Sequence, residues 1–497
     1  MRSCCVMSSD GKKGKYYLPA IFKGIMMKYC YYLLLFLVYM LPHSVQAQRS
    51  TLITKGDKAY VSLRYADAIA YYLPAISRDS SNNKVMVNLA DSYYSTQQYG
   101  QALHWYKKII QAGAADDLAL FRCGQLLAMH GRYQEAAAQY RQYLAKGHAD
   151  TLLEQTAALY ETGMSSLYRD TATVTSCLLN ISSGYADFSP AFHRYGMMFV
   201  SDRPYLQPFK RSNGWNGGAF LALYSIQDTA RIKDVVLRTA ELEQVLSYAP
   251  TDVYNKDNNT ISSNDSRVVG ADPKFNYIPV DNQLSNQMVT RFDASLSGRY
   301  HVGPAAFTRQ QDTLAVTYNN PGKSGKDGIS RLELRFFKAT RDGWKALADF
   351  PYNSPDYSVG HPAFVPGGQA LFFTSDMPGG LGGKDIWYCL RTDRGWSQPR
   401  NAGPRVNTAG NEMFPYVAPS GILYFSSDRW PGLGGLDIFY VPLDDQHHPA
   451  SAPQNAGAPM NSARNDFGVL LFNSGIEGYF SSDRRGNDDI YRFGPKR

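Results

Sequence analysis

The sequence LYFSSDR at residues 423–429, followed by GLDIFY at residues 435–440, decides the fold of most of the chain. Related copies stand at residues 371–388 and 478–491, and each holds short apolar runs between turns rich in Gly, Pro and Asp, as β-strands do. The predicted third strands begin at aspartates that are 52 residues apart, namely Asp385, Asp437 and Asp489. A period of this size with three or four strands per unit predicts a β-propeller of four-stranded blades.

Two further units precede these copies, with MFVSDR at residues 198–203 and LAVTY at residues 314–318. We therefore expect an all-β propeller over residues 170–495 with five recognisable blades, and a sixth blade is the alternative. The stretch 226–295 is long enough for a degenerate blade or for an insertion, and its polar, turn-rich composition favours the insertion. Circular closure requires an N-terminal strand in the last blade, which residues 171–179 could supply.

A second period, of 34 residues, organises the N-terminal region. Three of its columns are Ala68, Ala102 and Ala136; Tyr72, Tyr106 and Tyr140; and Gly56, Ala90 and Gly124. Each alanine and the tyrosine four positions later lie on the same face of a helix. The small residues allow two helices to approach closely, and the tyrosine rings fill the space between neighbouring pairs. This pattern resembles the tetratricopeptide repeat, a helix–turn–helix unit.

Residues 50–168 are therefore expected to form an all-α solenoid of three tetratricopeptide repeats, in which residues 151–167 form a capping helix. Ser80 stands where the repeat usually has a proline. Such a short array either binds a protein or peptide on its curved surface or packs on the next domain as a spacer. The sequence favours neither interpretation.

Aspartates also recur at the ends of the predicted second strands, and these are Asp202, Asp376, Asp428 and Asp483. Together with the aspartates of the third strands they are predicted to be structural repeat residues, because Asp or Ser at a turn accepts hydrogen bonds from nearby backbone N–H groups. An active site would be asymmetric. Asp385 and Asp437 could contribute to a calcium site with nearby carbonyls, but the oxygen ligands are not clustered enough to define one, so no metal site is predicted.

The sequence contains no catalytic motif that we recognise. Ser324 comes closest to a nucleophile elbow, but Lys326 stands where the second glycine is required. No HExxH motif occurs, and His447 and His448 are predicted to form a chance surface cluster. We therefore expect a protein that is not an enzyme, with no catalytic residue and no cofactor, and a hydrolase with an unrecognised site is the alternative. No basic run is interleaved with aromatic residues, so nucleic acid is not an expected partner.

Residues 1–47 are predicted to be a signal peptide that is cleaved after Ala47, because Lys28 precedes an apolar run that ends in small residues. Residues 1–26 could be an overcalled translation start. The segment contains six Lys or Arg residues and one Asp, so it carries +5 of the net charge of +8, and +3 remains for the mature chain. The basic character therefore belongs mainly to targeting, and no transmembrane segment is expected after cleavage.

The order of a secretion signal, tetratricopeptide repeats and WD40-like propeller repeats resembles a periplasmic family of Bacteroidetes-type bacteria. The matching stretches are residues 187–192, 300–307, 361–364, 375–388, 411–440 and 466–491. This family includes PorE, a component of the type IX secretion system, and its members usually continue into a carboxypeptidase-regulatory-like β-sandwich and an OmpA-like peptidoglycan-binding domain. The chain ends at Arg497 without either module, so the resemblance implies a scaffold but not peptidoglycan anchoring.

The resemblance and the two repeat architectures predict a non-enzymatic periplasmic protein-binding scaffold at the outer membrane, acting in type IX secretion or in cell-envelope organisation. Its expected partners are proteins, among them an outer-membrane protein similar to PorP. The alternative is a carbohydrate- or peptidoglycan-binding module that uses aromatic residues such as Trp215, Trp344, Trp396 and Trp430. Trp344 and Trp396 occupy similar places in successive blades, so packing within the blades is the preferred interpretation for both.

Overall fold

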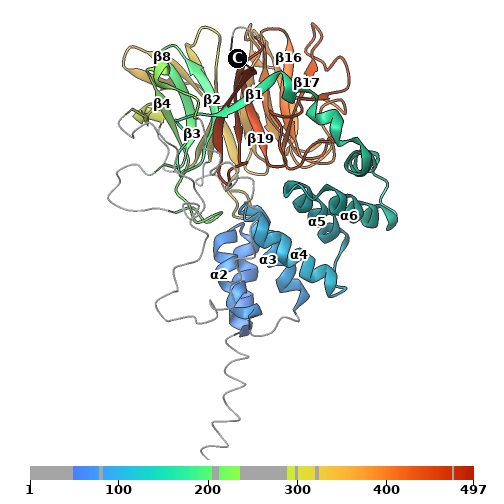
Figure 1. Ribbon diagram of the computed structural model, residues 1–497. Helices are drawn as coiled ribbons and strands as arrows, with labels where there is room; N and C mark the ends of the chain where they lie inside the picture. The colour runs from blue at the N-terminus through green and yellow to red at the C-terminus, as the bar shows by residue number, and fades with distance from the viewer. Residues whose placement is uncertain are drawn as a thin grey trace, which may run out of the picture.

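The chain forms an array of helices that lies below one face of a β-propeller (Figure 1). The computed structural model describes residues 49–77, 82–203, 212–235, 288–296, 300–319, 324–472 and 475–496. The predicted signal peptide, residues 1–47, lies outside the described residues. Within the described part of the chain, no helix is both long and apolar enough to cross a bilayer.

The helical array consists of three antiparallel pairs and a capping helix, which confirms the predicted solenoid. The first pair is formed by residues 49–61 and α2 (Tyr65–Ile76), the second by α3 (Asn83–Ser95) and α4 (Tyr99–Gln111), and the third by α5 (Asp117–Met129) and α6 (Tyr133–Ala145). The capping helix α7 (Thr151–Ala158) packs on α6 and continues through a π-helical turn (Leu159–Gly163) and a 3-10 segment (Met164–Ala172) toward the propeller.

A column of N-terminal caps explains where these helices begin. The side chains of Asn82, Asp116 and Asp150 accept hydrogen bonds from the backbone N–H groups three residues further on, at 3.1, 2.7 and 2.9 Å. Such caps satisfy N–H groups that the first turn of a helix leaves without partners. The three residues are 34 positions apart. Helix α7 is therefore the first helix of a fourth, incomplete unit.

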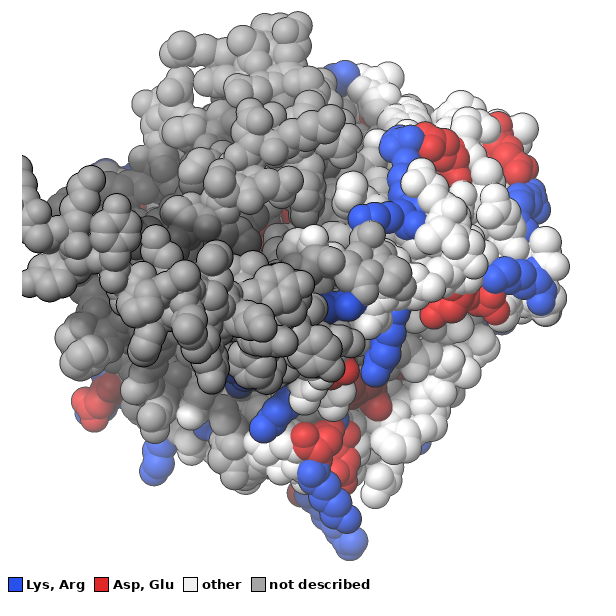
Figure 2. All heavy atoms as spheres, turned by 90° about the horizontal axis from the view of Figure 1, so that it is seen from below, with Lys and Arg blue, Asp and Glu red and all other residues white. Residues whose placement is uncertain are grey.

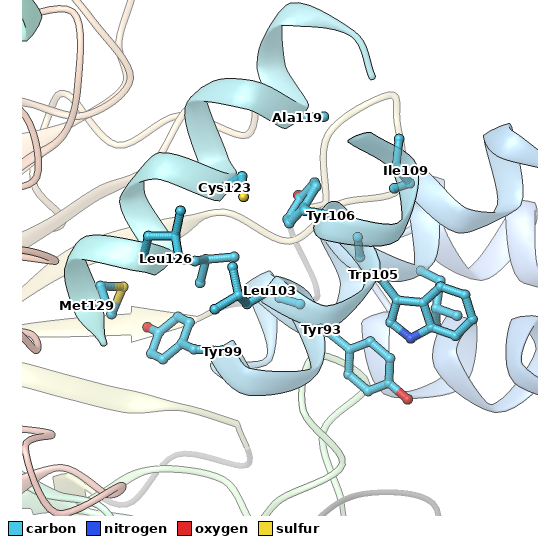
Figure 3. Close-up of a cluster of buried hydrophobic side chains, with 14 of the residues drawn as sticks. Tyr93, Tyr99, Leu103, Trp105, Tyr106, Ile109, Ala119, Cys123, Leu126 and Met129 are labelled. Carbon is cyan, nitrogen blue, oxygen red and sulfur yellow. The ribbon is translucent and has the colours of Figure 1, made fainter. Parts of the chain in front are cut away.

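The predicted alanine and tyrosine columns lie in the core of the array. Ala68, Ala102 and Ala136 are completely buried, and Tyr72, Tyr106 and Tyr140 are at most 4% exposed. A Cβ atom at Gly56 or Gly124 would collide with the tyrosine ring of its own unit, which explains the small residues in that column. Figure 3 shows Leu103, Tyr106 and Ile109 of α4 facing α5, where Cys123 and Leu126 belong to the same buried cluster.

Five sheets form the propeller, which confirms the predicted five blades. Blade 1 contains β2 (Asp187–His193), β3 (Gly196–Ser201), β4 (Ala222–Ile226) and β5 (Thr290–Arg291). Blade 2 contains β6 (Val302–Phe307), β7 (Thr313–Asn319), β8 (Leu332–Thr340) and β9 (Gly343–Ala346). Blade 3 contains β10 (Val359–Phe364), β11 (Ala370–Ser375) and β12 (Asp385–Thr392), which pairs with β13 (Gly395–Trp396) and β14 (Arg400–Asn401). Blade 4 contains β15 (Glu412–Val417), β16 (Ile422–Ser427), β17 (Asp437–Pro442) and β18 (Gln454–Asn455).

Blade 5 closes the ring with a strand from the start of the domain. It contains β19 (Asp466–Leu471), β20 (Gly478–Ser482), β21 (Asp489–Pro495) and β1 (Val174–Leu178). Strand β1 pairs antiparallel with β21, from Val174 opposite Pro495 to Leu178 opposite Tyr491. The prediction of a closing strand within residues 171–179 is therefore confirmed.

The stretch 226–295 lies within blade 1, because β4 and β5 on either side of it pair with each other. Among the described residues it adds no sheet to the five. Residues 236–287, which make up most of the predicted insertion, lie outside the described residues.

The blades pack face to face, and this explains their apolar second strands. Phe372 of blade 3 and Phe425 and Phe439 of blade 4 belong to one buried cluster, each at most 2% exposed. Strands that are buried on both faces have nearly continuous apolar runs, such as LFF at residues 371–373. On the face seen from below, described acidic and basic residues lie side by side, without a large patch of one sign (Figure 2).

Candidate functional site: the junction of the helical repeats and the propeller

The aspartates that follow the second strands hold the start of the innermost strand of their blade. Each accepts a hydrogen bond from the backbone N–H of the residue immediately before that strand. The donors Ala186, Ser358, Asn411 and Asn465 lie 2.6 to 2.8 Å from the carboxylates of Asp202, Asp376, Asp428 and Asp483, respectively. The same contact in four blades is a requirement of the fold.

In two blades the arginine that directly follows this aspartate, in the sequence Ser-Asp-Arg, also forms a contact within its own blade. Arg203 donates two hydrogen bonds to Asp187, at 2.9 and 3.0 Å, and both residues are at most 5% exposed. In blade 5, Arg484 donates to Asp466 at 2.6 Å. Both pairs join the end of the second strand to the start of the innermost strand.

Blade 4 departs from this arrangement because Glu412 replaces the aspartate at the start of the innermost strand. Its carboxylate accepts hydrogen bonds from Thr408 N–H at 2.9 Å, from the Thr408 hydroxyl at 2.6 Å and from the Ser427 hydroxyl at 2.7 Å. Burial raises the pKa of Glu412 to about 7, and these hydrogen bonds oppose the shift. The arginine of this blade, Arg429, pairs with Asp150 of the helical array instead.

Arg429 reaches into the helical array. Its guanidinium forms an ion pair with Asp150, the N-terminal cap of α7, and lies 4.6 Å from the centre of the Phe121 ring of α5. The side chains of Arg429 and Asp150 are 9% and 19% exposed. An arginine on an aromatic face with a largely buried carboxylate partner is a strong anchor.

Two other contacts join the helices to the propeller. The amide of Asn465, in the loop before blade 5, donates a hydrogen bond of 2.9 Å to the hydroxyl of Tyr99. In blade 1, Trp215 donates from Nε1 to the carbonyl of Ser95 at 2.8 Å, and its ring contacts the ring of Tyr65 edge-on. Thus loops of blades 1, 4 and 5 all contact the array. The array packs on the propeller, as the spacer interpretation expects.

A polar ladder runs through the first two helical units. The hydroxyl of Tyr72 donates to Asp57 at 2.7 Å and accepts from Asn88 at 3.1 Å. One unit later, Tyr106 donates to Asp91 and accepts from Arg122 at 3.1 Å. Tyr72 and Tyr106 therefore each have one acidic and one donor partner.

The third unit breaks the ladder. Gln125 stands where the first two units have an aspartate, and its side chain accepts a hydrogen bond from Tyr94 at 3.4 Å. Thr156 stands where the first two units have the donors Asn88 and Arg122, and its hydroxyl donates instead to the carbonyl of Leu152 at 2.8 Å. As a result, no described residue forms a hydrogen bond with the hydroxyl of Tyr140.

The aspartates that open the third strands also differ from one another. Asp385 accepts hydrogen bonds on both oxygens, from Leu381 N–H at 2.6 Å, from Gly382 N–H at 3.2 Å and from the Asn401 amide at 2.7 Å. Asp489 pairs with Arg485 at 3.3 Å, and burial raises its pKa to about 8.

Asp437, like Asp489, leaves Oδ1 without a hydrogen-bond partner among the described residues. Its Oδ2 accepts from Gly434 N–H at 3.0 Å, but no described residue bonds Oδ1, although the residue is only 2% exposed. The amide that would correspond to Asn401 belongs to Asn455, and it donates to the carbonyl of Pro431 at 3.3 Å instead. Burial therefore raises the pKa of Asp437 well above its ordinary value, and the nearby Asp466 adds to the shift.

These deviations meet in one cavity, which we call the junction pocket. It lies between α5, α6, α7 and the loop between β16 and β17, and its polar lining includes Gln125, Tyr140, Thr156, Tyr160, Asp428, Arg429 and Asp437. Burial raises the pKa of Tyr140 and Tyr160, so both hydroxyls keep their protons. The junction pocket thus combines carboxylates and the Arg429 guanidinium of the propeller with hydroxyls of the helical repeats.

The residues considered for catalysis do not form a site in the described part of the chain. Ser324 is exposed, and His448 lies 3.4 Å from Asp444 in an exposed loop. The described residues contain no group of three or more His, Cys, Asp or Glu side chains arranged to hold a metal ion. One half-buried histidine, His361, was not considered in the sequence: desolvation lowers its pKa to about 3, and its ring stacks on Phe414 at 4.1 Å. It is therefore a neutral packing residue.

The four tryptophans considered for glycan binding are in structural contacts. Trp215 lies at the junction, and Trp430 donates a hydrogen bond of 2.9 Å from Nε1 to the carbonyl of Val406. Trp344 and Trp396 are half-buried at equivalent places in blades 2 and 3, where their rings lie about 6 Å from Phe307 and Phe336, respectively. These contacts agree with packing within the blades.

The hairpins between first and second strands lie at the opposite ends of these strands from the loops that contact the helices. Tyr195 and Ile476, in the hairpins of blades 1 and 5, are each 65% exposed. The two blades are neighbours here, because the rings of Phe192 and Phe472 lie 5.7 Å apart. We call the surface around Tyr195 and Ile476 the free-face patch.

Comparison with known proteins supports the repeat assignment. A tetratricopeptide repeat family model matches residues 53–117. No curated protein matches the chain.

Several solved structures resemble the chain distantly. A gluconolactonase from Xanthomonas campestris has 15% identity over 42% of this chain and 65% of its own, with a TM-score of 0.27. The tricorn protease has 10% identity over 62% of this chain and 25% of its own, with a TM-score of 0.29. A puromycin-hydrolysing peptidase of Mycobacterium tuberculosis has 12% identity over 61% of this chain and 44% of its own, with a TM-score of 0.28. These scores are too low to carry an argument about activity.

Tetratricopeptide repeats and a five-bladed propeller together indicate a protein-interaction scaffold, and the repeats indicate that its partners are proteins.

Proposed function

We propose that the protein is a non-enzymatic periplasmic scaffold that binds an envelope protein at the outer membrane, in type IX secretion or in envelope organisation. The observation that carries this proposal is the docking of the helical array on one face of the propeller, which leaves the free-face patch exposed on the other. The resemblance of the repeats to the PorE-containing family and the signal-like residues 1–47 support the compartment. An outer-membrane protein similar to PorP is the partner that this resemblance suggests.

The free-face patch is the surface that we assign to the partner. Large apolar side chains that remain exposed next to one another mark protein-binding surfaces. Tyr195 and Ile476 are exposed in the hairpins of two neighbouring blades, and the rings of half-buried Phe192 and Phe472, from the same blades, lie 5.7 Å apart. Tyrosine is also enriched at protein interfaces because it combines an apolar ring with a polar hydroxyl.

Crosslinking in cells that produce the full chain, followed by purification from the envelope fraction, tests this function. A defined envelope protein should be recovered with the wild type and lost with the double variant Tyr195→Ser, Ile476→Ser. The matched control is Leu381→Ser, since Leu381 is 50% exposed but lies in the loop after β11, on the side of the helices. Equal recovery with all three proteins would refute the assignment of the surface, and recovery of no partner would refute the scaffold.

The compartment is tested separately. Fractionation should find the wild type in the periplasm or with the outer membrane, and a chain that lacks residues 1–47 in the cytoplasm. A wild-type protein that stays in the cytoplasm would refute the periplasmic proposal without affecting the scaffold itself.

A further inference from the structure

In the junction pocket, the helical array covers a carboxyl group that the propeller leaves incompletely bonded. In blade 3, three hydrogen bonds reach the two oxygens of Asp385. In blade 4, the equivalent Asp437 has no described partner on Oδ1, although the residue is only 2% exposed. A buried ionised carboxylate requires donors on both of its oxygens. The surroundings of Asp437 therefore fit a neutral carboxylic acid better than a carboxylate.

The charged groups of the propeller near Asp437 also disfavour its ionisation. Asp428 lines the same pocket, and both of its oxygens already accept hydrogen bonds, at 2.8 and 2.7 Å. Asp466 of blade 5, which pairs with Arg484, acts on Asp437 as a second like charge. The guanidinium in the lining belongs to Arg429, which is paired with the cap of α7. A negative charge on Asp437 would therefore lie beside other carboxylates without a cation of its own.

The helical side of the pocket supplies polar groups but no positive charge. Its polar lining residues are Gln125, Tyr140, Thr156 and Tyr160. Burial raises the pKa of both tyrosines, so their hydroxyls stay neutral. Tyr133 of α6 also interacts with Asp437, and burial raises its pKa in the same way. The array thus removes Asp437 from water without compensating its charge.

Docking is therefore coupled to the protonation of Asp437. Burial raises the pKa of Asp437 well above its ordinary value of 3.8. The cavity beside it has a volume of about 30 Å³, and one water molecule requires roughly 10–15 Å³ on the same scale. A neutral Asp437 can thus donate a hydrogen bond to a water molecule there. When the array leaves the propeller, the pocket opens, and Asp437 can ionise in bulk water.

We propose that the junction is a pH switch, in which the helical array docks on the propeller while Asp437 is neutral, and release of this proton to water at higher pH loosens the docking. Docking is strongest below the ordinary pKa of an aspartate, where Asp437 is neutral in both states. It weakens as pH rises toward the raised pKa of the docked state. Because one proton is bound per docking event, the docking equilibrium changes about tenfold per pH unit in this interval.

Hydrogen exchange of the full chain between pH 5 and pH 8 tests the switch. Protection factors, which are corrected for the pH dependence of the intrinsic exchange rate, report docking in α7 and in the loop between β16 and β17. In the wild type they should fall with rising pH, by up to about tenfold per pH unit, while those of β7 and β8 in blade 2 stay constant. Asp437→Asn should abolish this fall, because the amide resembles the neutral acid at every pH.

Asp489→Asn is the matched control. Burial raises the pKa of Asp489 to about 8, and its Oδ1 also has no described partner, but the residue lies in blade 5 and does not line the junction pocket. This variant should keep the pH dependence of the wild type. If Asp437→Asn does not fold, Asp437→Ser replaces it, because any neutral side chain removes the titration.

Three results would overturn the proposal. The first is wild-type protection in α7 and the loop that does not change between pH 5 and pH 8, as expected if water molecules satisfy an ionised Asp437. The second is the same fall with pH in the Asp437 variant as in the wild type. The third is loss of the fall in Asp489→Asn, which would place the titrating group outside the junction.

Discussion

Arg429→Ala should loosen the helical array from the propeller while leaving both units folded. The side chain contributes to neither core, because its guanidinium contacts Asp150 and Phe121 of the array. The equivalent arginines, Arg203 and Arg484, instead hold the innermost strands of their own blades. Removing Arg429 therefore tests docking without removing a contact on which the fold of blade 4 depends.

The expected loss of docking free energy depends on how far Arg429 and Asp150 are buried. Breaking a buried ion pair by removing one partner costs about 3–5 kcal/mol, and a cation–π contact in a desolvated place contributes about 2 kcal/mol. With 9% and 19% exposure, Arg429 and Asp150 are not fully buried, and Asp150 keeps the N–H of Leu153 as a donor. We therefore expect the variant to weaken docking by about 2–4 kcal/mol, which is roughly a 30- to 1000-fold change in the docking equilibrium.

Hydrogen exchange measured by mass spectrometry is the appropriate assay. Exchange should accelerate in α5, α7 and the loop between β16 and β17, and stay unchanged in β7 and β8 of blade 2. The control is Arg391→Ala, because Arg391 lies 5.0 Å from the ring of Trp396, away from the helices. The reasoning is refuted if Arg429→Ala gives the same exchange pattern as the wild type or as Arg391→Ala.

Three further changes test other parts of the structure. Glu412→Gln should remove a pH dependence of about 3 kcal/mol in the free energy of unfolding, because the pKa of about 7 in the folded state, against the ordinary 4.5, makes stability fall as pH rises between these values. Denaturant unfolding at pH 5 and pH 8 measures this dependence. An equal loss of stability between the two pH values in the wild type and the variant would contradict the prediction. Thr175→Pro should lower Tm more than Ser176→Pro. The N–H groups of a strand point alternately to either side, and the hydrogen bond from Leu179 N–H to the Ile490 carbonyl shows that the N–H of Thr175 points toward β21. Equal changes in Tm for the two variants would contradict this alternation. Gly124→Val should cost about 1–3 kcal/mol in urea unfolding, because its side chain collides with Tyr140, and an unchanged midpoint would show that the ring can move aside.

The fold could be predicted from the sequence because each repeat carries its own pattern. A period of 34 residues with Ala and Tyr columns requires helix pairs, and a period of 52 residues between Asp385, Asp437 and Asp489 requires blades. The column of caps formed by Asn82, Asp116 and Asp150 was available in the same way and was overlooked. It would have identified α7 as the start of a fourth unit.

The junction could not be predicted, because it depends on residues that depart from these patterns. Arg429 belongs to the same motif as Arg203 and Arg484, and nothing in the motif shows that it pairs with a helix. Asp437 and Asp385 occupy the same repeat position, and the difference arises only from where a neighbouring amide points. Contacts between units follow from three-dimensional complementarity, which has no period in the sequence.

The departures at the junction have a common physical cause. A repeat array satisfies its polar groups within each unit or with the next one, so a unit that docks on a different domain must redirect some of them. In blade 4 the acid of the innermost strand is Glu412, which accepts hydrogen bonds from Thr408 and Ser427, and the arginine pairs with the helices instead. In the third helical unit the loss of the acid leaves Tyr140 for the junction pocket. Residues that break a repeat pattern while remaining buried are therefore the best guide to contacts between the two units of this protein.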